Sequence, residues 1–181
     1  CVHGPTAFQQ LLPQLHADSL QVARTHLVPA PGVAVLDLYC GIGASLRQWS
    51  DADATTLGVE LAGGAVECIA ANAPRAQVLR GTCAQRMPQV RDWWRGRENM
   101  PRAAYVNPPR SGLEPVVMQA LAGELRPARI AYLSCSAGTL ARDLAAFEAA
   151  GYAVQRLVPY DFFPGTHHVE CLALLGLAAA R

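Results

Sequence analysis

The segment Val33-Ala-Val-Leu-Asp-Leu-Tyr-Cys-Gly-Ile-Gly43 determines the fold class that this sequence predicts. Its first seven residues form a nearly continuous apolar run, which is typical of a strand buried on both faces. Two glycines then make a tight turn, and a helical pattern follows to about Ser50. A buried strand that leads through a glycine turn into a helix is the opening unit of a parallel α/β sheet.

The same alternation of strand and helix continues along the chain. Six further strands are predicted, at residues 55–60, 76–79, 103–107, 129–133, 153–160 and 169–177. Helical patterns separate the earlier strands, which implies parallel pairing with right-handed crossovers. The last two strands follow one another directly, which favours a hairpin whose final strand is antiparallel. We therefore predict an α/β fold with one doubly wound, mostly parallel, Rossmann-like sheet of seven strands.

The chain is expected to divide into a helical lead-in, residues 1–30, and a main domain, residues 31–181. Apolar residues recur near helical spacing from Pro5 to Leu27, and Pro13 is expected to kink this helix or split it in two. The first residue is Cys rather than Met, so we expect the chain to be part of a longer protein.

Composition narrows the class of protein. The chain has 181 residues, of which 51% are hydrophobic, which suits a folded domain with a substantial core. We find no apolar run of membrane-spanning length and no leader-like segment. The six cysteines have neither C-x-x-C nor zinc-ligand spacing, so reduced thiols, no metal site and a cytoplasmic location are expected. The net charge of +1 comes with scattered arginines and neither requires nor excludes an RNA partner.

In doubly wound sheets, ligands bind beyond the carboxyl ends of the strands. Gly41 and Gly43 permit close backbone approach to a ligand there, and Glu60 ends the second strand, where a carboxylate can accept hydrogen bonds from both ribose hydroxyls. A dinucleotide fingerprint would place a third glycine at Leu46. The pattern therefore fits S-adenosyl-L-methionine better than NAD, although a structural turn beside a surface Glu is the plainer alternative.

The turn Asn107-Pro-Pro-Arg-Ser-Gly112 follows the fourth predicted strand. Two prolines stiffen the turn, and the Asn amide offers both a donor and an acceptor to a planar base. The alternative is a strand-ending turn in which Arg110 is solvated.

Two further residues could carry chemistry. Cys135 follows the fifth strand and precedes a predicted helix, whose positive end would stabilise a thiolate. Glu170 begins the last strand in apolar surroundings, where a carboxylate is costly unless it is used or paired. Burial of Cys135 as a small hydrophobe remains the alternative, and His167 and His168 are expected to pack on the phenylalanines of their loop.

Taken together, these motifs resemble the RNA 5-methyluridine (uracil-C5) methyltransferase family. The matching segments run in family order: Phe8-Gln9, 37–43, 58–60, 107–112, Ser134-Cys135, 139–143 and 161–170. Asn107 in place of Asp before Pro-Pro-Arg is similar to the branch that acts on 23S ribosomal RNA. Ser136-Ala137, Gln10-Leu11 and Ile42 or Ala44 depart from the family pattern.

The resemblance implies an RNA methyltransferase with a class I S-adenosylmethionine-dependent fold, whose residues 31–181 form the catalytic domain. Cys135 would add to carbon 6 of a uracil, and Glu170 would remove the carbon-5 proton. The implied cofactor-binding residues are Gln9, Tyr39, Gly41, Gly43, Glu60 and Asn107. The implied RNA-binding residues are Asn107, Pro108 and Arg110, and the partner would be rRNA or tRNA.

Two other functions stay open from the sequence. An amino-group methyltransferase acting on adenine or guanine could use Asn107-Pro-Pro, but it needs no nucleophilic cysteine and usually has an aromatic residue at the position of Arg110. A non-catalytic domain that binds S-adenosylmethionine or RNA is suggested by the substitutions at Leu11, Ala44 and Ser136. RNA-binding regions that family members carry before this domain are absent from the sequence, and it does not determine the oligomeric state.

Overall fold

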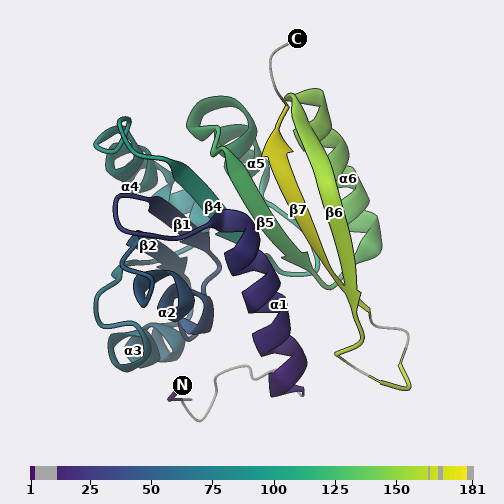
Figure 1. The fold of residues 1–181 in the computed structure, drawn as a ribbon, viewed down its shortest axis with the longest axis horizontal. Helices are drawn as coiled ribbons and strands as arrows, with labels where there is room; N and C mark the ends of the chain where they lie inside the picture. The colour runs from purple at the N-terminus through teal and green to yellow at the C-terminus, as the bar shows by residue number, and fades with distance from the viewer. Residues whose placement is uncertain (3–11, 163, 167–168, 179–181) are drawn as a thin grey trace.

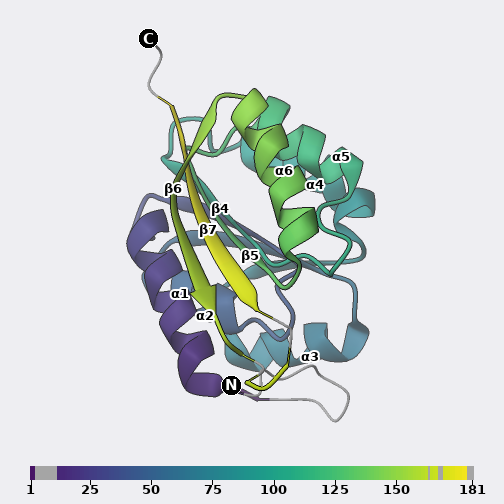
Figure 2. The same ribbon diagram turned by 90° about the vertical axis from the view of Figure 1, so that its right-hand side faces the viewer.

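The fold of the chain is an α/β sheet covered by helices on both faces (Figures 1 and 2). The computed structural model describes residues 1–2, 12–162, 164–166 and 169–178. The strands are β1 Ala34–Leu38, β2 Thr55–Glu60, β3 Gln77–Arg80, β4 Arg102–Val106, β5 Arg129–Ser134, β6 Tyr152–Tyr160 and β7 Glu170–Leu177. The helices are α1 Pro13–Leu27, α2 Ala44–Ser50, α3 Gly63–Asn72, α4 Cys83–Arg95, α5 Pro115–Gln119, the π-helix η1 Ala120–Leu125 and α6 Ala137–Ala149.

The strand order within these residues is β3-β2-β1-β4-β5-β7-β6. The first five strands are parallel, and β7 is inserted antiparallel between β5 and β6. The predicted seven-stranded, mostly parallel, doubly wound sheet is confirmed, as is the terminal hairpin. Each strand lies within one or two residues of its predicted bounds.

Strand β1 supplies side chains to two separate hydrophobic cores, one on each face of the sheet. Val35 packs with residues of α1 and α2, whereas Leu36 and Leu38 pack with residues of α4, α5 and η1. All five residues of β1 are buried, which explains the continuous apolar run in the sequence. Figure 2 shows α1 and α2 on one side of the sheet and α4, α5 and α6 on the other.

Helix α1 corrects the prediction for Pro13. This proline occupies the first helical position, where its missing N–H costs no intrahelical bond and its fixed φ favours helix initiation. Pro13 therefore starts the helix and does not kink it. The predicted helical residues 5–11 lie outside the described part of the chain, so the alternative that Pro13 splits a longer helix in two stays a prediction.

The helical segment after β4 also differs from the expected regular helix. Only Pro115–Gln119 is α-helical, and Ala120–Leu125 continues as a π-helix. The Arg126 N–H donates to the Leu121 carbonyl at 3.2 Å, an i to i−5 bond, and Arg126 ends the helix in the left-handed conformation.

Candidate active site

The predicted functional side chains come from five strands that reach one edge of the sheet. Parallel strands β1, β2, β4 and β5 all have their carboxyl ends there, and antiparallel β7 begins there. Figure 1 shows these ends on the side of the sheet toward the N-terminus of α1. The residues contributed by the five strands are Tyr39, Glu60, Asn107, Cys135 and Glu170.

The glycine turn after β1 is held by the carboxylate that follows β2. Glu60 Oε2 accepts the Gly41 N–H at 2.9 Å, and Oε1 accepts the Ala62 N–H at 2.8 Å. Gly41 and Gly43 have φ of 55° and 85°, and a Cβ built on Gly41 would have no atom of the described residues within 4 Å beyond its chain neighbours. An ionised carboxylate has about four acceptor positions, so Glu60 can hold the turn and still accept two ligand hydroxyls.

Tyr39 links this turn to the loop after β4. Its backbone has φ of 60°, which is uncommon for a residue with a side chain, and its hydroxyl donates to Glu114 Oε2 at 2.9 Å. Burial raises the pKa of the Tyr39 hydroxyl, and the neighbouring Cys83 and Glu114 raise it further. Tyr39 is therefore a neutral donor at physiological pH.

A buried carboxylate to which the sequence analysis gave no role lies under the turn. Asp37 is fully buried in β1, and Trp49 Nε1 donates to its Oδ2 at 2.8 Å. Its Oδ1 has no hydrogen-bond partner in the described part of the chain. Burial raises the pKa of Asp37 to about 7, against the opposing effect of Ser45 and Trp49, and Glu60 adds to the rise. An acidic residue inside an apolar run was the signal that could have identified it.

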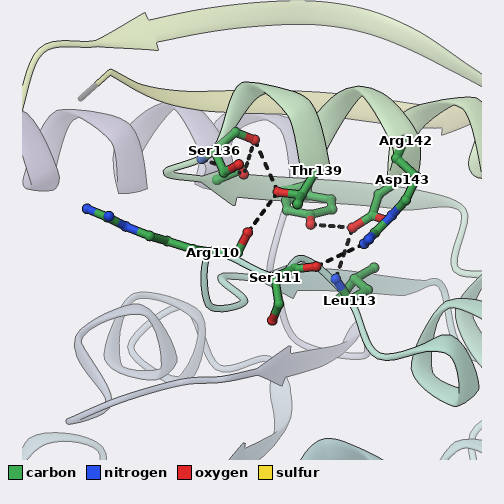
Figure 3. A network of polar contacts seen from close by, with 9 residues as sticks. Arg110, Ser111, Leu113, Ser136, Thr139, Arg142 and Asp143 are labelled. Atoms are coloured by element: carbon green, nitrogen blue, oxygen red, sulfur yellow. Dashed lines mark hydrogen bonds and ion pairs between the residues drawn. The ribbon is translucent and has the colours of Figure 1, made fainter. Parts of the chain in front are cut away.

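The loop after β4 places the Asn-Pro-Pro turn next to β1. The Asn107 N–H donates to the Leu38 carbonyl at 3.2 Å, which continues the β1–β4 pairing beyond the strands. Asn107 is half-buried, Pro108 is buried, and Pro109 and Arg110 are exposed. The Arg110 side chain points away from the neighbouring polar contacts (Figure 3), so it is free to meet a ligand from solvent.

The register of β5 against β7 brings Cys135 and Glu170 to facing positions. The antiparallel ladder runs from Arg129–Gly176 to Ser134–Cys171, and the next residue on each chain is Cys135 and Glu170. Cys135 is half-buried, whereas Glu170 is buried. The two residues that sequence reasoning assigned to chemistry therefore stand one position beyond the ladder, at the carboxyl end of β5.

The Glu170 carboxylate also affects the pKa of a buried tyrosine in β4. Burial raises the pKa of Tyr105 in β4, and the nearby carboxylates of Asp37 and Glu170 and the Tyr160 side chain raise it further. Tyr105 is therefore near both carboxylates, and its strand β4 lies between β1 and β5 in the sheet.

Ser134 and Ser136 fix the backbone on either side of Cys135. Ser134 Oγ accepts the Ser136 N–H and donates to the Ser136 carbonyl, each at 3.2 Å. Thr139 Oγ1 also contacts the Ser136 carbonyl, at 3.3 Å. These contacts use only the backbone of Ser136, so they do not depend on which side chain stands at this position (Figure 3).

Some predicted positions fall outside the described residues. These are Gln9, expected in the cofactor site, and His167, His168 and Phe163 of the last loop. Among the described side chains, no group of three His, Cys, Asp or Glu residues is arranged to hold a metal ion. The helices in the same ranges are too short or too polar to traverse a bilayer.

Comparison with known proteins identifies the family. The sequence matches the family described as tRNA (Uracil-5-)-methyltransferase over residues 20–177. A curated relative from Lactococcus lactis, described as an uncharacterized RNA methyltransferase, is 37% identical over 178 residues, covering 95% of this chain and 37% of the relative. A relative of the same description from Nostoc is 32% identical over 180 residues, covering 96% of this chain and 37% of its own length.

Solved structures agree with this result. The tRNA (uracil-54, C5)-methyltransferase of Pyrococcus abyssi in complex with S-adenosyl-L-homocysteine superimposes with a TM-score of 0.72 at 25% identity, over 94% of this chain and 40% of that one. A precorrin-6y C5,15-methyltransferase from Geobacter metallireducens shares the fold at 13% identity, with a TM-score of 0.67 over 97% of this chain and 93% of that one. The class I methyltransferase fold is thus confirmed.

The chain spans about two fifths of the length of the curated relatives. The family match covers most of the chain and includes the glycine turn, the Asn-Pro-Pro loop, Cys135 and Glu170. The resemblance found from sequence motifs is confirmed at the level of the family, and the 23S rRNA branch stays a prediction. The chain belongs to the tRNA (uracil-5-)-methyltransferase family.

Proposed function

We propose that this protein uses S-adenosyl-L-methionine to methylate carbon 5 of a uridine in RNA, through a covalent adduct with Cys135. The observation that carries the proposal is the β5–β7 register, which sets a half-buried thiol opposite a buried carboxylate at the edge that also holds the glycine turn. A nucleophile and a base facing one another are the pair that this reaction requires.

The residues around the glycine turn suit S-adenosyl-L-methionine. Gly41 leaves open space where a side chain would project, and Glu60 keeps acceptor positions for ribose hydroxyls. The cofactor would be held by Tyr39, Gly41, Gly43, Glu60 and Asn107, with Gln9 as a further predicted contact. When bound, it supplies an electrophilic methyl group on a sulfonium.

Cys135 performs the first step of the mechanism. Carbon 5 of uracil is a weak nucleophile, and addition of the Cys135 thiolate to carbon 6 forms a C–S bond and turns the C5=C6 bond and the C4 carbonyl into an enolate. The enolate places electron density on carbon 5, where the new methyl group is accepted. The hydrogen bonds between Ser134 and Ser136 keep the intervening Cys135 backbone in one conformation during this step.

Glu170 performs the last step. After methylation, its carboxylate removes the carbon-5 proton, the C5=C6 double bond forms again, and the C6–S bond breaks to release the Cys135 thiolate. The proton remains on Glu170 until it passes to solvent. The net products are 5-methyluridine, the demethylated cofactor and one proton.

The RNA partner would present the uridine flipped out of its stack. While the base is stacked in an RNA helix, its carbons 5 and 6 could not reach Cys135 and Glu170. Asn107 would pair with the base edge, Pro108 would set the direction of the amide, and exposed Arg110 would meet phosphate. The family description names tRNA, whereas Asn107 resembles the ribosomal branch. We therefore propose rRNA or tRNA as the substrate, to be separated by assay.

The experiment uses the natural full-length protein, S-adenosyl-L-methionine, and tRNA and rRNA fragments that carry 5-fluorouridine. Fluorine at carbon 5 cannot leave as a proton, so an adduct that resists SDS should accumulate with the correct RNA. We expect Cys135→Ala to abolish both adduct and turnover. We expect Glu170→Gln to retain an adduct with unmodified RNA and to lose most turnover, because the elimination step lacks its base.

A matched control is available in the neighbouring thiol. Cys171 pairs with Ser134 in the sheet and is also half-buried, but burial raises its pKa. Cys171→Ala should leave adduct formation within about twofold of wild type. Methylation that survives Cys135→Ala would contradict the proposal and favour an amino-group methyltransferase, and full turnover by Glu170→Gln would remove Glu170 from the role of base.

A further inference from the structure

A third buried carboxylate, Asp143, joins three elements of the fold (Figure 3). Asp143 belongs to α6 and is 3% exposed. Its Oδ2 accepts the Tyr132 hydroxyl of β5 at 2.7 Å and the Leu113 N–H of the loop after β4 at 2.9 Å. One oxygen therefore connects the helix, the strand that leads to Cys135 and the loop that begins at Asn107.

The neighbouring arginine extends this contact. Arg142 Nε and Nη2 both donate to Asp143 Oδ1, at 2.9 and 2.7 Å, and Nη2 also donates to the Ser111 carbonyl at 3.0 Å. One turn earlier on α6, Thr139 Oγ1 donates to the Arg110 carbonyl at 3.1 Å. Side chains of α6 thus bind main-chain groups of three loop residues. The hydrogen bonds between Arg142 and Asp143 are charge-assisted, so they are the strongest in this set of contacts. We name this set of contacts the Asp143 clasp.

The loop is shaped to accept the clasp. Gly112 has φ of +78°, and a Cβ built there would lie 2.5 Å from Arg142 Nη2 and 2.6 Å from Asp143 Oδ2. A side chain at position 112 would therefore be strained in its backbone and would also push the carboxylate and the guanidinium away. The glycine of Asn-Pro-Pro-Arg-Ser-Gly is required by close approach to α6.

The loop after β4 combines one packed side chain with an open pocket, since Leu113 is buried in the hydrophobic core. A cavity of about 460 Å³ opens between residues 111–115 of the loop and the Met118, Arg142 and Ala146 side chains of α5 and α6. Dense packing is what normally holds a segment rigid in a protein interior. Leu113 anchors the loop by packing, and the polar contacts to Asp143 and Arg142 hold the loop backbone on the side where the pocket opens.

We propose that Asp143 is a positioning residue for the methyl-transfer reaction, because its carboxylate fixes the Asn107 loop against the segment that carries Cys135. The proposal rests on the proposed function, since it assumes that Asn107 and Cys135 meet the same uracil. Asp143 touches neither the base nor the cofactor. It acts through Leu113 on one side and through Tyr132, three residues before Cys135, on the other.

The proposed reaction requires a fixed spacing between the Asn107 loop and Cys135. Thiolate addition needs the reacting atoms in a narrow range of distance and direction, and a misplacement of about 1 Å can cost on the order of 100-fold in rate. The two groups that face the base belong to loops 28 positions apart in sequence, so no local structure sets their spacing. A buried charge is also an expensive way to gain stability alone, because apolar side chains of similar volume are often as good.

The test compares two buried tyrosines that each lose one hydroxyl. Tyr132→Phe removes a bond to Asp143, and Tyr152→Phe removes a bond of 2.9 Å to the Pro127 carbonyl, far from the site edge. Both residues are buried, at 0% and 3% exposure, so we expect similar losses in melting temperature. Asp143→Asn is made beside them. All variants are assayed in the full-length protein, with RNA and cofactor both saturating.

We expect Tyr132→Phe to lower kcat about tenfold and Asp143→Asn to lower it about 100-fold, with the rate of the 5-fluorouridine adduct falling in parallel. Cofactor affinity, measured by calorimetry, should change less than twofold in both. Tyr152→Phe should keep kcat within twofold. Hydrogen exchange of the Leu113 and Gly112 amides should accelerate in Asp143→Asn and not in Tyr152→Phe.

Other results would overturn the proposal in distinguishable ways. Equal loss of kcat in the two tyrosine variants would reduce Asp143 to a purely structural residue, and so would wild-type kcat in Asp143→Asn. A wild-type protein that never forms the Cys135 adduct would overturn the proposed function itself, and the role of Asp143 with it. Unchanged amide exchange in Asp143→Asn would show that the loop is held by something other than the clasp.

Discussion

Two buried aspartates lie in the two halves of the site edge, one near the glycine turn and one near the Asn107 loop. They differ in their hydrogen-bond partners. Asp37 in β1 and Asp143 in α6 are 0% and 3% exposed. Asp143 accepts bonds from a tyrosine, a backbone N–H and an arginine, whereas Asp37 Oδ1 has no partner in the described part of the chain. Burial sets the cost of a carboxylate, but its partners decide whether the fold gains or loses from it.

The two halves of the site edge also differ in the contacts that hold their loops in place. In the half around the glycine turn, main-chain N–H groups of Gly41 and Ala62 bind the Glu60 carboxylate, so one side chain from the end of β2 holds the turn. In the reactive half, side chains of α6 hold the backbone of a loop that borders a cavity. We infer that substitutions in the first half mainly change ligand binding, and that substitutions in the second half change the shape of the site.

The largest effect on stability is expected from Asp143→Ala. The change leaves the Tyr132 hydroxyl and the Leu113 N–H buried without an acceptor, and Arg142 without its carboxylate. We expect the free energy of unfolding at pH 7 to fall by about 4 kcal/mol, since each of the two buried donors left without an acceptor costs about 1–3 kcal/mol. Urea denaturation followed by circular dichroism measures it.

A control for this prediction is Asp92→Ala, which removes an exposed carboxylate from a surface ion pair with Arg95. Its cost should be below about 1 kcal/mol. A loss of less than about 1 kcal/mol in Asp143→Ala as well would mean that the clasp contributes nothing to the fold.

Asp37 predicts a pH dependence of stability with the opposite sign from a paired carboxylate. Its pKa is raised from 3.8 to about 7, so below about pH 4 the carboxyl is protonated in both the folded and the unfolded chain. Between about pH 4 and pH 7 the unfolded chain releases this proton and the folded chain keeps it, so stability falls as pH rises. Above about pH 7 the loss is complete.

The size of this loss can be bounded. A shift of roughly three units corresponds to about 4 kcal/mol, and relaxation around the ionised group lowers this to on the order of 2–3 kcal/mol. Asp37→Asn should remove the dependence, so that the difference in unfolding free energy between variant and wild type grows in favour of the variant from pH 4 to pH 8. Parallel curves for the two proteins over this range would contradict the assignment.

The fold could be predicted from sequence because its signals are local. Continuous apolar runs marked the parallel strands, and each was followed by a helical pattern within a few residues. The exceptions are also instructive. Pro13 was read as a break because its position relative to the helix start was unknown, and η1 was missed because a π-helix has no distinct periodicity in six residues.

The site was predictable only in part, since its geometry depends on long-range pairing. Sequence placed Cys135 and Glu170 at one edge, but only the register of β5 against β7 brings them to facing positions. The Asp143 clasp joins residues 30 positions apart, and nothing local in Thr139-Leu-Ala-Arg-Asp143 indicates that its acid turns inward. Asp37 was quoted as part of a motif, yet its unpaired oxygen depends on packing around it.

The smallest expected effect is the difference between two glycine substitutions, one in each half of the site edge. Gly41 and Gly112 both have positive φ, at 55° and 78°, so alanine should cost about 1–2 kcal/mol of unfolding free energy at either position through backbone strain alone. A Cβ at Gly41 meets open space, whereas a Cβ at Gly112 meets Arg142 and Asp143. Gly112→Ala should therefore cost about 1 kcal/mol more than Gly41→Ala.

Ligand binding should rank the same two variants in the reverse order. Gly41→Ala fills space beside Glu60 that the proposed cofactor would use, so its affinity for S-adenosyl-L-methionine should fall at least tenfold, whereas Gly112→Ala should stay within about threefold. Gly123→Ala, in η1 with open space around it, is the control for a glycine change as such. Calorimetric titration and urea denaturation of the three variants give both rankings. If one variant were worse in both measurements, the proposed division into a cofactor half around the glycine turn and a half held by α6 beside Cys135 would be wrong.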